Sequence, residues 1–84
     1  MTTRSVVILA EGGAHARPVA ELVRLAMAHQ GQVGLTTAEG RQVDLGSVLA
    51  VMDLALVPGD EVVLSADGPD AESLLEALAR VLDG

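Results

Sequence analysis

The sequence of 84 residues contains no phenylalanine, tyrosine, tryptophan, cysteine or lysine. Without cysteine the chain has neither disulfides nor thiolate metal sites, and its two histidines argue against a structural zinc site. Without aromatic residues the core must be built from Val, Leu, Ile, Ala and the three Met. Apolar residues make up 50% of the chain, which suffices for one small core. We expect a single domain over residues 1–84.

The chain also lacks a long apolar run and an excess of positive charge. No segment reaches the length of about 20 apolar residues that a helix needs to cross a bilayer. Residues 1–4 lead directly into a strand-like segment in place of a signal peptide's hydrophobic stretch. We therefore expect a cytoplasmic protein with no membrane insertion. The formal charge of −7 argues against nucleic acid as a partner, because nucleic acid binding needs a basic surface.

The charge is unevenly distributed along the chain. Residues 1–41 hold four basic and three acidic side chains, whereas residues 42–84 hold one basic and nine acidic side chains. This asymmetry predicts a weakly positive region beside an acidic one. An anion would be tolerated in the first of these regions.

Hydrophobic periodicity in the first half predicts a strand, a helix and a hairpin. Residues 5–10 are rich in β-branched side chains and end at a Glu-Gly-Gly turn, which is typical of a strand. A helical period begins at Ala16 and stops at Gly31. Residues 32–37 and 41–45 each alternate between apolar and polar side chains, which predicts an antiparallel hairpin with its turn at the intervening Glu-Gly pair.

The second half predicts two more helices and one more strand. Ser47 precedes the apolar segment 48–54 and is the expected N-cap of a short helix. The pair Pro58-Gly59 predicts a type II turn that leads into a strand over residues 60–66. A final helix follows, with Pro69 in its first turn and leucines along one face.

The predicted order of elements is therefore βαββαβα. The strands are apolar on one side only, which indicates an antiparallel sheet with one covered face. We expect an α+β fold in which three helices cover one face of a four-stranded sheet.

One segment brings a titratable ring to the start of a helix. Residues 12–18 have the sequence Gly-Gly-Ala-His-Ala-Arg-Pro, in which the glycines allow the backbone to approach a ligand closely. Pro18 fixes a helical φ where its missing N–H is not needed. The remaining N–H groups of a first helical turn favour an anion, and Arg17 can bring a guanidinium to the same place. A neutral His15 is a nucleophile that can form a covalent intermediate.

Two interpretations of His15 follow. A histidine ahead of a helix is often only a polar N-terminal residue, but its neighbours Arg17 and Pro18 favour the chemical role. We find no Ser, Cys or Asp partner arranged for hydrolysis, so we expect a carrier and not an enzyme.

The second histidine, His29, is explained by a favourable interaction with the C-terminal end of the helix dipole.

Two motifs resemble those of a known family. Residues 13–18, Gly-Ala-His-Ala-Arg-Pro, resemble the active-site signature of the histidine-containing phosphocarrier proteins, HPr, of the bacterial phosphoenolpyruvate-dependent sugar phosphotransferase system. Residues 47–54, Ser-Val-Leu-Ala-Val-Met-Asp-Leu, resemble the second, serine-headed signature of the same family. The resemblance covers essentially the whole chain and implies an open-faced β-sandwich.

The resemblance also implies roles for individual residues. It implies that His15 accepts a phosphoryl group on Nδ1 from enzyme I and passes it to sugar-specific IIA domains, without a metal or cofactor. Ala16 and Arg17 would bind the phosphoryl group. Ser47 would be the serine that HPr kinase modifies in some members, although helix capping alone explains this residue. The implied partner surface consists of Ala20, Arg24, Val48, Leu49 and Met52.

Several alternatives stay open. The chain could be a regulatory interaction module of the same fold, controlled through Ser47 and bound to a transcription regulator. It could also carry phosphoryl groups in a nitrogen- or dihydroxyacetone-related chain, because Gly46 and Ala50 stand where basic residues are common in the family. Arg24 either pairs with Glu21 in a solvated charge ladder or belongs to the docking rim. We expect a monomer, since a carrier needs small, transient interfaces.

Overall fold

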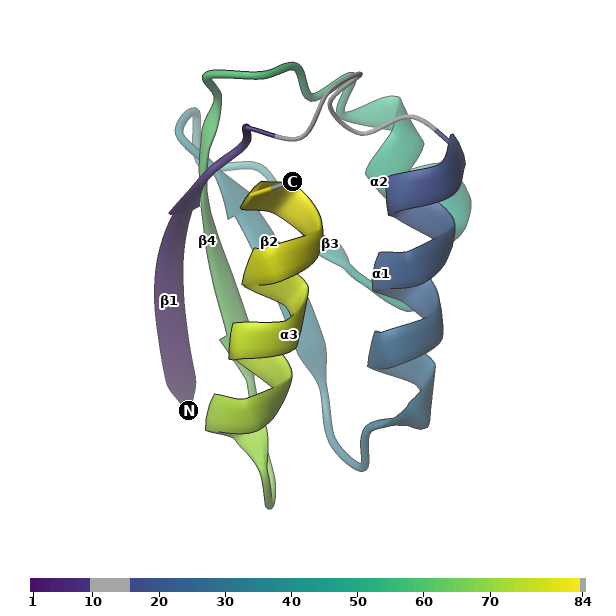
Figure 1. Ribbon diagram of the computed structural model, residues 1–84, viewed down its shortest axis with the longest axis vertical. Helices are drawn as coiled ribbons and strands as arrows, with labels where there is room; N and C mark the ends of the chain where they lie inside the picture. Colours follow the sequence, from purple (N-terminus) through teal and green to yellow (C-terminus); the bar gives the residue numbers. More distant parts are fainter. Residues whose placement is uncertain (10–15, 84) are drawn as a thin grey trace.

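The described part of the chain forms four strands and three helices in the computed structural model (Figure 1). The structure describes residues 1–9 and 16–83, with the side chains of the first helix described from Pro18 onward. The elements are β1 (Thr2–Val7), α1 (Ala16–Ala28), β2 (Val33–Thr37), β3 (Gln42–Asp44), α2 (Val48–Asp53), β4 (Glu61–Ala66) and α3 (Ala71–Asp83). The predicted order βαββαβα is confirmed.

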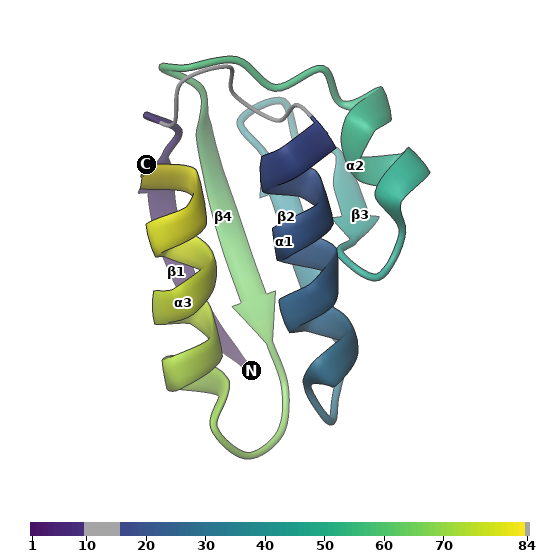
Figure 2. The ribbon, with the colours of Figure 1, turned by 45° about the vertical axis from the view of Figure 1, so that its right-hand side comes forward.

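The four strands form one sheet in the order β1-β4-β2-β3, and every neighbouring pair is antiparallel. The long helices α1 and α3 pack against each other on one face of this sheet, and α2 contacts α1 and β3 (Figures 1 and 2). The structure therefore has the predicted α+β architecture, an open-faced β-sandwich.

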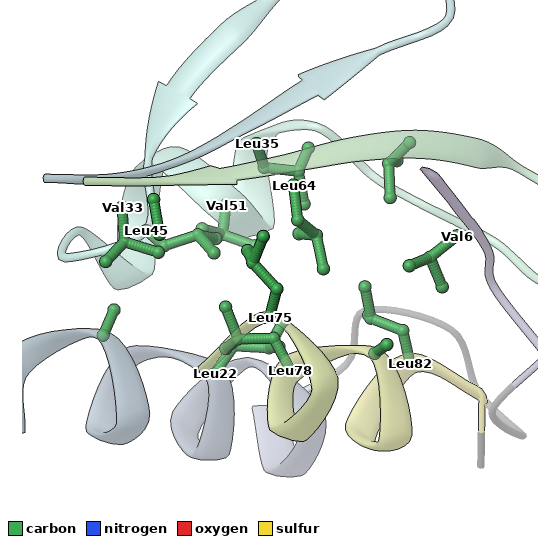
Figure 3. Packing of buried hydrophobic residues seen from close by; sticks show 14 of the residues in the cluster. Val6, Leu22, Val33, Leu35, Leu45, Val51, Leu64, Leu75, Leu78 and Leu82 are labelled. Atoms are coloured by element: carbon green, nitrogen blue, oxygen red, sulfur yellow. The ribbon is translucent and has the colours of Figure 1, made fainter. Parts of the chain in front are cut away.

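The core lies between the sheet and the helices and is entirely aliphatic (Figure 3). Alternate residues of β4 face the helices, so Val62, Leu64 and Ala66 are buried while the residues between them are more exposed. Opposite them, the helices contribute fully buried leucines such as Leu22 and Leu78. Burying one such side chain stabilises the fold by about 1.5–3 kcal/mol. The core is therefore built from many small, similar contributions.

The first strand lies earlier in the sequence than residues 5–10, where it was expected. β1 pairs with β4 from Thr2, opposite Ala66, to Val7, opposite Glu61. Ile8 and Leu9 leave the sheet, and their N–H groups donate to the carbonyls of Asp60 and Leu82 at 2.8 and 2.9 Å. The prediction was wrong because the partner strand sets the limits of β1, whereas the apolar run continues beyond them.

The last helix begins later than its proline suggested. Pro69 was expected in the first turn, but α3 starts at Ala71. Asp70 has a φ of +63°, outside the helical region, and its carbonyl accepts a hydrogen bond from the N–H of Leu74 at 3.0 Å. Pro69 therefore lies in the turn that precedes the helix.

The turn before α3 packs closely against the end of α1. Gly68 has a φ of +86°, and a Cβ there would lie 2.5 Å from the carbonyl oxygen of Gln30. On the other side, a Cβ at Gly31 would lie 2.6 Å from the carbonyl oxygen of Asp67. The Nε2 of His29 is hydrogen-bonded to that same carbonyl. His29 therefore joins two loops, a role that the dipole explanation did not include.

Replacing Gly68 by Ala should destabilise the fold more than the same change at Gly40. Both glycines have similar positive φ values, +86° and +91°, but nothing lies within 4 Å of a Cβ at Gly40. The steric overlap with Gln30 should therefore cost Gly68→Ala about 1–3 kcal/mol beyond the backbone strain that the two variants share. Urea unfolding followed by far-UV circular dichroism measures the difference. Equal losses in the two variants would contradict the close approach.

Candidate functional site

The predicted anion site lies at the start of α1. The helix begins at Ala16, directly after His15, and its first turn contains no acidic side chain. Pro18 is half-buried, and the next residue, Val19, is fully buried in the core. His15 and the side chains of Ala16 and Arg17 lie outside the described residues. The phosphoryl-binding roles of these three residues therefore stay predictions.

The second signature forms the short helix α2. The Ser47 hydroxyl accepts a hydrogen bond from the N–H of Ala50 at 3.2 Å, and its backbone is extended, with φ −116° and ψ 110°. Ser47 is therefore the N-cap, as predicted. The preceding turn is closed by Asp44, whose carboxylate accepts from the N–H of Gly46 at 2.7 Å and whose carbonyl accepts from the N–H of Ser47.

Only one side of α2 can be buried, because the helix has six residues and lies at the edge of the helical layer. Val51 is the side chain that anchors it in the core, with no exposed surface. Leu49 is 81% exposed, Met52 43% and Val48 42%. The three apolar residues predicted for the partner surface are thus exposed, and their docking role stays a prediction.

A stripe of exposed side chains on α1 belongs to the same region. Ala20, Arg24 and Met27 are all exposed, and their spacing places them on one side of the helix. Figures 1 and 2 both show α2 beside the half of α1 that begins at Ala16. Met27, which is 73% exposed, was not predicted for this surface, although its position seven residues after Ala20 was a usable signal.

Two ion pairs lie on this side of the molecule. Arg24 donates to both carboxylate oxygens of Glu21, with a distance of 3.0 Å from its Nε. These hydrogen bonds hold the pKa of Glu21 below its ordinary value. Arg41, just before β3, donates to the carboxylate of Asp53 at the end of α2, at 3.3 Å. The Glu21–Arg24 ladder is therefore present, and membership of Arg24 in a docking rim stays a prediction.

Metal sites and membrane-spanning helices are two further possibilities for the part of the chain that the structure describes. No three His, Cys, Asp or Glu side chains gather there where they could hold a metal ion. None of the described helices combines the length and the apolar character needed to cross a bilayer.

Comparison with known proteins identifies the family of this chain. The family described as "PTS HPr component phosphorylation site" matches residues 2–83. The chain belongs to the HPr family. It is 39% identical over 82 residues to the phosphocarrier protein HPr of Cupriavidus necator, covering 98% of this chain and 91% of that one. It is 35% identical over 83 residues to the HPr of Vibrio cholerae, covering 99% and 96%.

Solved structures of HPr proteins share the fold as well. The HPr of Bacillus anthracis superposes with a TM-score of 0.88 at 30% sequence identity, covering 96% of this chain and 95% of that one. The family match over residues 2–83 includes the sequences of both predicted signatures and of all the described strands. The two regions described above, the start of α1 and the α2 surface, therefore lie within a complete HPr fold.

Replacing Ser47 by Ala should destabilise the protein by about 1 kcal/mol, because the N–H of Ala50 loses its acceptor. Ser73→Ala is the matched control, since Ser73 is an exposed residue inside α3 where alanine is the better helix former. Urea unfolding of both variants measures the two effects. If Ser47→Ala were as stable as Ser73→Ala, the cap would contribute nothing to stability.

Proposed function

We propose that this chain carries phosphoryl groups between proteins of the phosphoenolpyruvate-dependent sugar phosphotransferase system. In this proposal His15 accepts a phosphoryl group from enzyme I and passes it to sugar-specific IIA domains. The supporting observation is the match to the HPr phosphorylation-site family over residues 2–83, with α1 beginning directly after His15. The protein would act in the cytoplasm as a monomer.

The chemistry needs few groups. The lone pair of the neutral His15 Nδ1 attacks the phosphorus atom of the donor, a new N–P bond forms, and the donor's own bond to phosphorus breaks. Backbone N–H groups of the first turn of α1 and the Arg17 guanidinium then offset the added negative charge. The same steps in reverse deliver the phosphoryl group to a IIA domain. The carrier is itself a covalent intermediate and not an enzyme, and it uses no cofactor.

The exposed faces of α1 and α2 would be the docking surface for both partners. Leu49 is the most exposed apolar side chain of α2 and lies two residues before the buried anchor Val51. Exposed apolar side chains grouped beside a reactive residue are typical of protein interaction sites. Because enzyme I and the IIA domain must both reach His15, they would use this surface in turn.

Replacing His15 by Ala should abolish phosphoryl acceptance, since the attacking nitrogen is lost. The protein is incubated with phosphoenolpyruvate and enzyme I, and intact-mass spectrometry counts the phosphoryl groups before and after a brief acid treatment. The natural chain should gain one acid-labile group. His29→Gln is the control and should still accept it.

Three results would contradict or refine this function. Acceptance that persists in His15→Ala would refute the assignment of the phosphorylated residue. Absence of modification with enzyme I of the sugar, nitrogen and dihydroxyacetone systems alike would refute the carrier function and favour an interaction module controlled through Ser47. Acceptance from only one of the three enzymes would assign the phosphotransfer branch.

Replacing Leu49 by Ala should slow phosphoryl transfer from enzyme I without weakening the fold. Leu49 is 81% exposed, so we expect a stability change within about 0.5 kcal/mol. The loss of a central apolar contact should reduce the transfer efficiency by about fivefold or more. Val51→Ala is the contrasting variant, because Val51 is fully buried and its truncation should lower the stability. Transfer at the natural rate in Leu49→Ala would remove α2 from the docking surface.

A further inference from the structure

Two cations beside the proposed docking surface, both among the residues whose side chains the structure describes, have carboxylate partners within the chain. Arg24 lies on the exposed stripe of α1 and is held through two nitrogens by Glu21. Arg41 is bonded to Asp53 at the end of α2. The chain has no lysine that could replace them. The described rim of this surface therefore has two positive charges, and both are offset locally.

The Glu21–Arg24 pair reduces the hydrogen-bond donors and the net positive charge that the surface presents to a partner. A guanidinium that donates two hydrogen bonds to one carboxylate has fewer donors left for a carboxylate of another protein. The hydrogen bonds from Arg24 lower the pKa of Glu21 and so favour its charged form, which brings a negative charge to this surface. Both pairs are exposed to solvent, so they exchange with other partners instead of excluding them. A partner must compete for Arg24 and must also approach the negative charge of Glu21.

The centre of the same surface is apolar. Leu49, Met52 and Val48 of α2 are 81%, 43% and 42% exposed. An apolar centre with a nearly neutral rim matches a partner face that is apolar and weakly charged. An acidic partner face would gain little from such a rim, because complementary charge guides association and discriminates between partners.

We propose that Glu21 and Asp53 are specificity-determining residues that offset the positive charge of Arg24 and Arg41 and so disfavour acidic partner faces. The partner selected is a phosphotransfer protein whose docking face is apolar and nearly neutral. This inference rests on the proposed function for the location of the docking surface. The two carboxylates are the discriminating groups, because without them the positive charges of Arg24 and Arg41 are no longer offset.

The chain offers a matched control for the charge itself. Glu76 and Arg80 form a third exposed ion pair, on α3. Figures 1 and 2 show α3 on the opposite side of α1 from α2. Glu21→Gln and Glu76→Gln each remove one negative charge and leave one arginine without its helical partner. They differ in their distance from the docking surface.

The test compares docking to two enzyme I proteins, one with an acidic docking face and one with a nearly neutral face. All variants carry His15→Ala, so that docking is measured without phosphoryl transfer. At low salt, Glu21→Gln should bind the acidic enzyme I about threefold more tightly and the neutral one unchanged. Asp53→Asn should act in the same direction, and Glu76→Gln should leave both affinities unchanged. High salt should remove the gain.

The outcomes separate this inference from the proposed function. Equal effects of Glu21→Gln and Glu76→Gln, or an unchanged preference between the two enzyme I proteins, would overturn the role of Glu21. If the His15→Ala variants dock with the expected preference, but the natural chain with His15 intact is not phosphorylated, the carrier function would be refuted and the inference would stand. Failure of every variant to dock to either enzyme I would overturn both.

Discussion

The alternation of buried and more exposed residues along β4 is the constraint on which the rest of the structure depends. β4 lies between β1 and β2, so its backbone is paired on both sides, and it contacts the long helix α3. In a chain without aromatic residues, Val62 and Leu64 belong to an entirely aliphatic buried cluster, in which attraction depends on close packing. The helix α1 packs against α3 and contributes Leu22 to the same cluster.

The proposed docking surface results from the shortness of α2. One buried valine and one capping serine hold the helix in place, and its remaining apolar side chains have no room in the core. The same side chains that cannot be buried are therefore available for binding. The charged residues around them have a second effect, because intramolecular ion pairs decide how much positive charge a partner meets. The residues that hold α2 in place and the residues proposed for binding are therefore neighbours in the sequence.

Much of the fold could be predicted from the sequence, since the order of elements, the hairpin and the Ser47 cap all depend on local patterns. The limits of β1 could not, because they are set by pairing with residues that lie far along the chain. The start of α3 was missed because the positive φ of Asp70 leaves no periodic signal. In the site, the Glu21–Arg24 pair follows from helical spacing, whereas the Arg41–Asp53 pair joins different elements and needed the structure. The role of His15 stays a prediction that rests on its motif.

The pairing of the first strand with the fourth also sets an order for folding. Thr2 lies opposite Ala66, so the first strand has no partner until most of the chain has been made. The hairpin of β2 and β3 joins residues close in sequence and can form early, whereas the sheet is completed only by contacts between distant segments. During synthesis on the ribosome, β1 therefore stays unpaired until β4 has emerged. The helix α1 can reach its full packing only when the last third of the chain emerges.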